Sequence, residues 1–327
     1  MLKKVLLLSF CSLIACGVRA DFVSGERYFN ERNYSAAFNA FLPEADAGDK
    51  RSQYYVGYLY LNGLGVTQNP EKALEYLNAS ANKNYGSAQS LLGYLYDKGE
   101  IVSLNKKKAI ELYMAAADQN DPSAMLNLGL AYYKGDGVVR DTQKAIDLLQ
   151  RVPMDENRPY VGRYLGDIYM NSTDTNKVAK ATKEYKKSAR MGDIDSFYAL
   201  GQIYENMDDL ERAVVYYLYG ASKNNAAAQY LLGTMYVKGK GVEKNFITGH
   251  AWLEIAANQR YEPAREALME LDRNMTIRQS EEARKEFNRI QSEIINNVDS
   301  PFIAEEKAER ERMEKVKEEQ KIVRRRR

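Results

Sequence analysis

Few side chains in this sequence could carry out catalytic or metal chemistry. The 327 residues include one histidine, His250, and two cysteines, Cys11 and Cys16, both within the first twenty positions. Beyond those positions no thiol could act as a nucleophile with His250 or share a zinc ion with it. His250 lies two residues before Trp252, and we expect it to pack and not to catalyse.

Other kinds of reactive site are equally poorly supported. No Gly-x-x-x-x-Gly-Lys-Ser/Thr string is present, so no phosphate-binding loop is predicted. The 45 Asp and Glu residues fall mainly on helix faces that we expect to be solvated. No two of them are identified by the sequence as a glycosidase-like catalytic pair. A formal net charge of +2 gives no overall basic field for nucleic acid. We expect neither an enzyme nor a cofactor, metal, small-molecule substrate or nucleic-acid partner.

Residues 1–20 predict export. Two lysines precede an apolar run from Val5 to Cys16 that is too short to span a bilayer. Val18-Arg19-Ala20 offers small residues to an ordinary signal peptidase, which would release a soluble periplasmic or secreted protein. The alternative is that Leu13-Ile14-Ala15-Cys16, which resembles a bacterial lipobox, leaves Cys16 lipidated and the protein anchored to the outer membrane. Either product would lie outside the cytoplasm without a disulfide framework.

A Gly-x-x-Tyr pair recurs seven times along the chain. Successive glycines are 32, 36, 36, 37, 35 and 32 residues apart. In the last six copies an apolar residue precedes the glycine and a small or β-branched residue lies five positions before it, which places all of them on one helix face. Because glycine costs up to about 1 kcal/mol relative to alanine inside a helix, its recurrence indicates close approach by a neighbouring helix. The pairs are Gly25/Tyr28, Gly57/Tyr60, Gly93/Tyr96, Gly129/Tyr132, Gly166/Tyr169, Gly201/Tyr204 and Gly233/Tyr236.

Each unit continues into a second expected helix. This helix is marked by a basic residue before alanine, with small residues about eight positions later, and small residues on one face allow the next hairpin to stack. Three linkers carry Gly-x-Gly-Val, whose first glycine can end the first helix in a left-handed cap. The clearest basic pairs are Lys72-Ala73, Lys108-Ala109, Lys180-Ala181 and Arg212-Ala213, and the linkers begin at Gly63, Gly135 and Gly239.

The combined pattern resembles the Sel1-like repeat, a longer-looped relative of the tetratricopeptide repeat. The segment from Ala228-Gln229 through Gly233 and Tyr236 to Gly241-Val242 matches it almost residue for residue. The resemblance covers about Phe22 to Arg260. It implies an all-α fold, a right-handed α/α solenoid of about seven Sel1- or tetratricopeptide-like helix-turn-helix repeats.

The sequence divides into four predicted segments. A signal peptide at 1–20 precedes the repeat solenoid at 21–261, in which prolines between Leu149 and Pro159 predict a kink. C-terminal capping helices follow at 262–298, and a charged helical or disordered tail occupies 299–327. The tail ends in Arg324 to Arg327, and we interpret it as a soluble extension. The alternative is an anchor for anionic lipid, glycan or nucleic acid; in the case of lipid, the tail would be a second possible membrane tether besides Cys16.

The first helix of each unit is the expected binding face. In tetratricopeptide arrays this helix lines the concave side, so the inner positions fall at −6, −3, +1 and +4 from the repeat glycine. Tyrosine provides contact area at low entropy cost and arginine provides directional pairing. The tyrosines at +3 belong to the packing face and are expected in the core. The predicted partner-binding residues are Arg51, Tyr54, Tyr58, Tyr94, Leu126, Tyr133, Arg163, Tyr198 and Tyr230.

Two functions are compatible with this face. The first is an exported, non-enzymatic scaffold that binds a protein or peptide partner in its concave groove. The second is a protein directed at cell-wall glycan or polysaccharide, either as a binder or as an undetected hydrolase. Tyrosine-lined grooves accommodate peptides and sugars alike, so composition does not separate the two functions.

Overall fold

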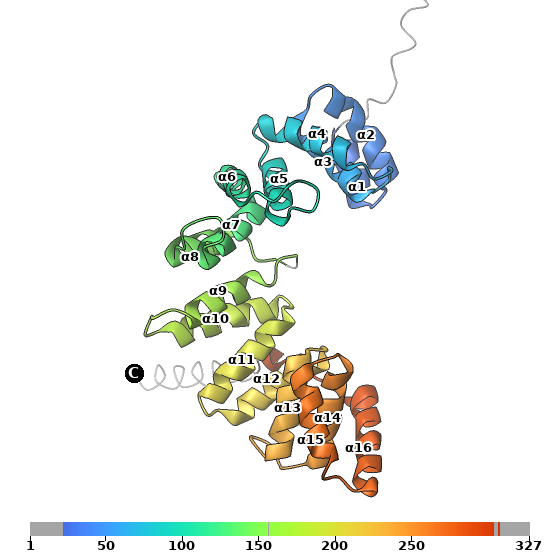
Figure 1. Cartoon of the computed structure of the whole chain (residues 1–327), viewed down its shortest axis with the longest axis vertical. Helices are drawn as coiled ribbons and strands as arrows, with labels where there is room; N and C mark the ends of the chain where they lie inside the picture. Colours follow the sequence, from blue (N-terminus) through green and yellow to red (C-terminus); the bar gives the residue numbers. More distant parts are fainter. Residues whose placement is uncertain (1–21, 156, 304–306, 308–327) are drawn as a thin grey trace, which may run out of the picture. The chain divides into compact units, whose positions relative to one another are not determined.

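The described part of the chain is helical throughout. The computed structural model describes residues 22–155, 157–303 and 307, and over these residues it contains no strand (Figure 1). The predicted all-α fold of stacked helix hairpins is confirmed. The helices are α1 (Phe22–Asn30), α2 (Tyr34–Asp46), α3 (Lys50–Asn62), α4 (Pro70–Asn82), α5 (Gly86–Lys98), α6 (Lys106–Ala117), α7 (Pro122–Lys134), α8 (Thr142–Arg151), α9 (Val161–Met170), α10 (Lys177–Arg190), α11 (Ile194–Asn206), α12 (Leu210–Ser222), α13 (Ala226–Lys238), α14 (Phe246–Asn258), α15 (Glu262–Asp272), α16 (Ile277–Arg289) and the π-helix η1 (Ile290–Ile294).

The helices form two compact units, which divide between Val152 and Pro153. The N-terminal unit contains α1 to α8 and the C-terminal unit contains α9 to η1. The 21–261 range predicted as one solenoid is thus divided at the proline-containing segment. The predicted signal peptide, and Cys16 with it, lies outside the described residues, as does most of the charged tail. None of the described helices combines the length and apolar character needed to cross a membrane.

Each repeat glycine lies against a large side chain of its partner helix. An ideal Cβ on Gly93 would be 2.8 Å from ring carbons of Tyr113, and one on Gly201 would be 2.5 Å from the ring of Tyr217. The facing residues are Leu77, Tyr113, Leu149, Tyr185, Tyr217 and Leu253 for the glycines of the last six units. Real Cβ atoms do not approach so closely, so glycine at this position sets the spacing within each hairpin.

Hydrogen bonds from buried glutamines connect one hairpin to the next. The amide groups of Gln53 and Gln229 donate to Ala45 O at 3.1 Å and to Ala221 O at 3.0 Å. Both carbonyls lie in the last turn of the preceding second helix, where no i+4 helical N–H reaches them. These glutamines therefore tie α3 and α13 to the units before them.

The second glycine of the long linker makes another contact between units. Gly65 has a φ of +68°, and a Cβ there would lie 2.3 Å from the backbone of Tyr34 and Ser35 at the start of α2. Ser35 Oγ donates to Gly65 O at 3.3 Å. Only glycine combines this left-handed conformation with such a close approach, so the linker tip docks on the preceding second helix.

The prediction that the +3 tyrosines are core residues is largely wrong. Tyr60 and Tyr204 are buried, but the other five are only half-buried. The basic residue of the second helix covers the ring instead: Lys108 Nζ lies 4.3 Å from the Tyr96 ring centroid and donates to Tyr96 Oη at 2.8 Å. The same cation–π arrangement joins Tyr60 to Lys72, Tyr132 to Lys144, Tyr169 to Lys180 and Tyr204 to Arg212.

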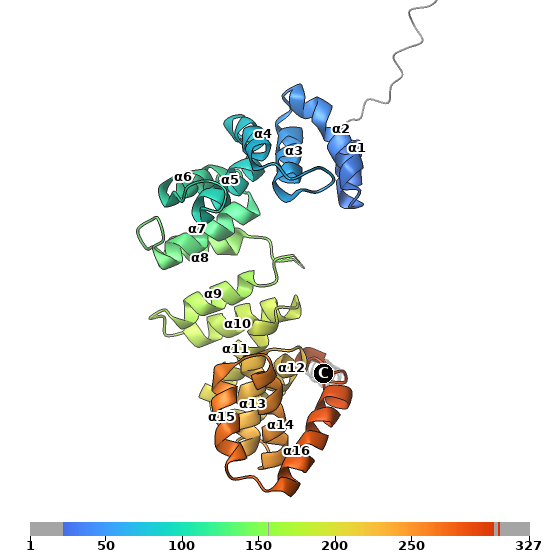
Figure 2. The same cartoon turned by 45° about the vertical axis from the view of Figure 1, so that its right-hand side comes forward.

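The C-terminal helices close the array without forming an eighth hairpin. Helix α16 packs against α14 and does not pair with α15 (Figure 2). Counting 36 residues on from Gly233, the repeat-glycine position of α15 holds Met269, which is 57% exposed. Thr248 stands where α4, α6, α8, α10 and α12 carry their basic residue, and its hydroxyl donates to Glu286 of α16 at 3.1 Å. A methionine at the close-approach position and a small residue on α14 together direct α16 onto the preceding unit.

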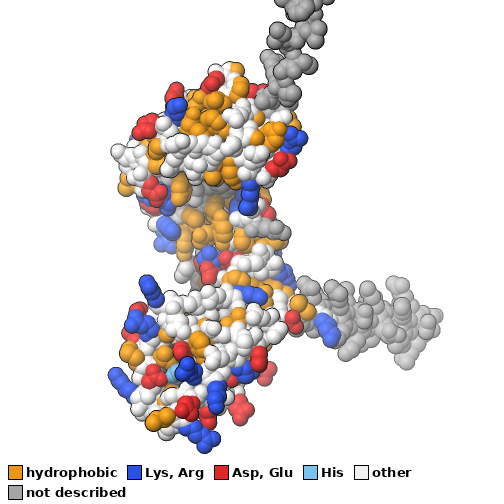
Figure 3. Space-filling view, turned by 90° about the vertical axis from the view of Figure 1, so that its right-hand side faces the viewer, with side chains coloured by type: hydrophobic (Ala, Val, Ile, Leu, Met, Phe, Trp, Pro, Cys, Tyr) orange, Lys and Arg blue, Asp and Glu red, His pale blue; other side chains and the backbone are white. Residues whose placement is uncertain are grey.

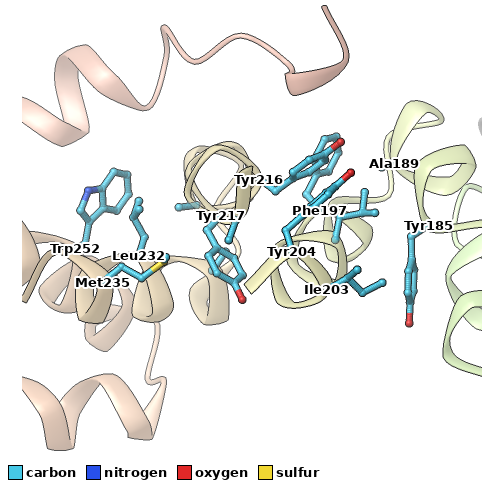
Figure 4. Close-up of a cluster of buried hydrophobic side chains, with 14 of the residues drawn as sticks. Tyr185, Ala189, Phe197, Ile203, Tyr204, Tyr216, Tyr217, Leu232, Met235 and Trp252 are labelled. Atoms are coloured by element: carbon cyan, nitrogen blue, oxygen red, sulfur yellow. The ribbon is translucent and has the colours of Figure 1, made fainter. Parts of the chain in front are cut away.

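The tail boundary lies later than the sequence indicated. Phe302, which falls in the predicted 299–327 tail, is 5% exposed. Its ring centroid lies 5.5 Å from that of Phe197 and 6.1 Å from that of Tyr216, and the Arg190 guanidinium lies over it at 4.7 Å. Phe302 therefore belongs to the core of the C-terminal unit, whose aromatic side chains are drawn in Figure 4.

A carboxylate on the inner side of the sixth hairpin also holds this unit together. Tyr217 Oη and Lys240 Nζ each donate to the Glu205 carboxylate at 2.8 Å. Burial opposes ionisation, but these hydrogen bonds outweigh it and hold the pKa of Glu205 below its usual value. The ionised form of Glu205 therefore stabilises the contact between α11, α12 and the linker that follows α13.

We predict that Gly93→Ala destabilises the N-terminal unit. The gain in helix propensity of about 1 kcal/mol is outweighed by overpacking against Tyr113, so the free energy of unfolding should fall by about 1–3 kcal/mol net of that gain. Urea unfolding followed by circular dichroism measures this change. Gly86→Ala in the same helix is the control, because its Cβ would meet only Gln119 at 3.4 Å. Equal destabilisation by both variants would contradict the close-contact explanation.

A second prediction concerns pH. Because the folded pKa of Glu205 is lowered, its stabilisation is fully present above the unfolded pKa of about 4.5 and is lost as the pH falls through the folded value. Glu205→Gln should therefore lower stability at neutral pH, and the difference from the unsubstituted protein should shrink as the pH falls below about 4. Fluorescence of Trp252, the single tryptophan, reports unfolding of this unit. A difference independent of pH would contradict a role for the ionised carboxylate.

Candidate functional site

The first helices of the N-terminal unit carry a layer of aromatic side chains. Tyr54 and Tyr58 lie one turn apart on α3, with ring centroids 6.3 Å apart. Phe29 of α1 packs on Tyr58 at 5.8 Å and Tyr85, before α5, packs on Tyr54 at 5.5 Å. Burial raises the pKa of Tyr54, so the phenol stays neutral. We call these four half-buried residues the aromatic layer.

Two further predicted residues lie in the same unit on the same series of helices. Tyr94 of α5 is 41% exposed, with Lys98 Nζ 5.6 Å from its ring centroid. Arg51 of α3 is exposed, and its guanidinium lies 3.9 Å from the Phe22 ring centroid. Both side chains keep surface that a partner could contact. Figure 3 shows hydrophobic side chains gathered on one face of the N-terminal unit, in the upper half of that view.

Helix α7 contributes less to this face than the sequence indicated. Leu126 is only 9% exposed and packs as a core residue, although its register placed it on the inner side. Tyr133 is half-buried, and the Arg140 guanidinium lies 5.6 Å from its ring centroid. Leu126 is therefore a poor candidate for contact with a partner.

Arg163 of the C-terminal unit already has partners within the chain. Its Nε lies 3.2 Å from Asp193 Oδ2, and its Nη2 lies 3.8 Å from Asp195 Oδ2. Asp193 also accepts from Ser196 N at 3.0 Å and so caps α11. The structure thus gives Arg163 a role in joining α9 to α11, which its spacing in the sequence could not reveal.

Tyr198 and Tyr230 are half-buried on α11 and α13. Tyr198 Oη accepts from Gln202 Nε2 at 2.9 Å, and its ring centroid lies 6.2 Å from that of Tyr217. The ring of Tyr230 packs against Tyr261 at 5.6 Å. Of the two, only Tyr230 also lines a cavity.

This cavity has a volume of about 570 Å³ and lies among α13, α14, α15 and the start of α16. Its floor includes Leu253, which is 1% exposed, and its mouth includes Phe246, which is 45% exposed. This cavity was not predicted from the sequence. The signal available there was Leu253 at a position where the third, fifth and sixth units carry the larger tyrosine. A larger hollow of about 770 Å³ is lined by residues of the turn before α12, the start of α12 and the linker after α13, and none of these residues is buried.

His250 joins the last regular unit to the capping helices. It is 8% exposed, and its Nε2 lies 2.8 Å from Asp272 Oδ1 at the end of α15. Its Nδ1 lies 3.9 Å from Glu254 Oε2. Among the described residues, no three His, Cys, Asp or Glu side chains are grouped so as to hold a metal ion.

Comparison with known proteins assigns the hairpins to a family. The Sel1 repeat profile matches residues 50–85, 86–121, 122–151 and 226–261. These ranges contain the hairpins α3–α4, α5–α6, α7–α8 and α13–α14. A search of curated proteins finds no match.

Solved structures of the same kind are similar to this chain. A Sel1 repeat protein from Oxalobacter formigenes is 28% identical with a TM-score of 0.60, and the match covers 73% of this chain and 100% of that one. A protective antigen of uropathogenic Escherichia coli with an SLR fold is 19% identical with a TM-score of 0.30, covering 85% and 84% of the two chains. Four of the glycine-spaced hairpins, three in the N-terminal unit and one in the C-terminal unit, are thus Sel1 repeats, and the chain is similar to solved Sel1-repeat proteins.

Proposed function

We propose that this protein is a non-enzymatic scaffold that binds a protein or peptide partner through the first helices of its N-terminal unit. Sel1-repeat proteins commonly act as scaffolds in protein–protein contact. The observation that carries the proposal for this chain is the aromatic layer together with the exposed ring of Tyr94. These aromatic side chains remain partly accessible to solvent, although a helical repeat could bury them more completely.

The chemistry of this face favours a protein partner. Half-buried tyrosines offer large, rigid contact area with a polar tip. Arg51 lies beside them with its guanidinium on the Phe22 ring, and this stacked position leaves its donors directed away from the ring. Rigid aromatic anchors flanked by arginine are the side chains most often found at the energetic centre of protein interfaces.

The proposal includes a location outside the cytoplasm. It is supported by residues 1–20, where a basic start precedes an apolar run and a small-residue cleavage site. Mass spectrometry of the mature N-terminus would distinguish cleavage after Ala20 from lipidation of Cys16. A mature chain that retains Met1 to Ala20 would contradict export.

We predict that Tyr58→Ala combined with Tyr94→Ala weakens partner capture at least about tenfold, which corresponds to about 1.4 kcal/mol. Tyr54 is left in place, because its ring contacts Tyr85 as well as Tyr58 and its removal would disturb folding. The measurement is quantitative capture by the immobilised full chain from an envelope extract, followed by affinity determination with the purified captured protein.

The matched control carries Met114→Ala and Val139→Ala. These apolar residues are 37% and 89% exposed in the same unit, but they lie outside the first-helix face. Capture should survive in the control, and both variants should unfold at nearly the same urea concentration. Equal capture by the two variants would refute this face as the binding site, and binding to purified cell-wall glycan without capture of any protein would refute a protein partner.

A further inference from the structure

The residue that faces the repeat glycine is tyrosine or leucine in the last six units, and Phe41 in the first. It is tyrosine in the third, fifth and sixth units, and leucine in the second, fourth and seventh. Tyr185 and Tyr217 point their rings in the same direction (Figure 4). Their hydroxyls reach carboxylates of the first helix: Tyr185 Oη donates to Asp167 at 2.7 Å, and Tyr217 Oη donates to Glu205 at 2.8 Å. A tyrosine here thus extends past the glycine to the inner side of the hairpin.

The sixth unit shows what occupies the space beyond the glycine. Counted from Gly201, the ring of Tyr217 lies beside Tyr198 at −3, with a centroid distance of 6.2 Å. Its hydroxyl ends at Glu205, the +4 residue. The ring therefore fills the inner surface of the first helix between positions −3 and +4.

In the seventh unit the same positions line the cavity. Tyr230 is at −3 from Gly233, Val237 is at +4, and Leu253 is the facing residue. Leucine is shorter than tyrosine, and the cavity lies against the positions that the Tyr217 ring covers in the sixth unit. Leu271 and Met275, from α15 and the turn after it, line the cavity opposite α13.

We propose that this cavity binds a phenylalanine side chain of a peptide segment, in the position that the Tyr217 ring takes in the neighbouring unit. The proposal rests on the protein- or peptide-binding function and names a second contact for it, in the C-terminal unit. The volume of about 570 Å³ falls in the range typical of ligand pockets. An exposed lysine and an exposed glutamate, Lys238 and Glu270, also line it, where they can pair with charged groups that flank the ring.

The first helix selects phenylalanine over tyrosine. The +4 carboxylate that accepts the tyrosine hydroxyl in the sixth unit is replaced by Val237. At +1, where the fifth unit has Asp167, the seventh has Thr234, whose hydroxyl donates to Leu231 O at 2.8 Å. A bound tyrosine would lack the hydrogen bond that Tyr185 and Tyr217 make within the chain, and an unpaired buried hydroxyl weakens binding.

The test is a titration of the full chain, isotope-labelled at its methyl groups, followed by NMR. The probes are three capped tripeptides, acetyl-Gly-Xaa-Gly-amide with Phe, Tyr or Ala at the centre. We expect the Phe peptide to shift the methyl signals of Val237 and Leu253 and to bind about fivefold or more tightly than the Tyr peptide. The Ala peptide should leave these signals unchanged.

Two variants sharpen the test. Leu253→Tyr supplies the missing ring from within the chain, as three other units already do, and should abolish the Val237 shifts while the protein stays folded. Val237→Glu restores the +4 carboxylate and should reverse the preference in favour of the Tyr peptide. Circular dichroism and Trp252 fluorescence establish that each variant is folded.

Several outcomes would overturn the proposal. These are undiminished Phe-peptide binding by Leu253→Tyr, equal binding of the Phe and Ala peptides, or no binding of any peptide. Binding of toluene as tight as that of the Phe peptide would show a site for small aromatic molecules and would overturn the peptide assignment. Tyr58→Ala with Tyr94→Ala should leave the titration unchanged, so failure here is distinguishable from failure of the aromatic layer as a binding site.

Discussion

The structure depends on the contact between the repeat glycine of each first helix and the leucine, tyrosine or phenylalanine that faces it from the second helix. A Cβ at Gly166 or Gly201 would lie within 2.5 Å of the facing ring, so glycine is required wherever a hairpin closes this tightly. The small residues around it, such as the fully buried Ala88 and Ala228, then bring the next hairpin into contact. Because dispersion and apolar burial fall off steeply with separation, one missing side chain per unit determines how well the rest of the unit packs.

The same contact controls what the inner face offers to a partner. In the fifth and sixth units the hydroxyl of the facing tyrosine donates to the inner carboxylates Asp167 and Glu205, so these groups are already paired within the chain. Where the facing residue is leucine, the inner surface is set by the neighbouring side chains. In the second unit the rings of Tyr54 and Tyr85 pack together, whereas in the seventh Leu253 helps to line a cavity. The surface of the inner face therefore depends on the facing residue and on the side chains around it.

The sequence was sufficient to predict the repeats because glycine, alanine and tyrosine recur at intervals of 32 to 37 residues. Such a recurrence can be recognised whatever residues lie between the repeated positions. It was insufficient for side chains whose environment is set by the adjacent unit. Leu126 and Arg163 have the correct register for the inner face, yet one is buried and the other pairs with Asp193. The half-buried +3 tyrosines depend instead on their own hairpin, because a lysine of the second helix covers the ring, as Lys108 does for Tyr96. Phe302 could not be assigned to the core without knowing that the chain returns to α11 and α12.

The end of the array shows how small departures from the repeat create a site. Met269 replaces the glycine that a second helix would need in order to pair with α15, and Thr248 replaces the basic residue that would otherwise stand where Glu286 approaches α14. Helix α16 is thus free to pack on α14, and α15 is left without its own partner helix. One side of the cavity is the face of α15 at Leu271, and the other is α13 beside Leu253. A terminal repeat must stop the stacking, and here the residues that stop it also leave unfilled the volume that an aromatic ring occupies one unit earlier.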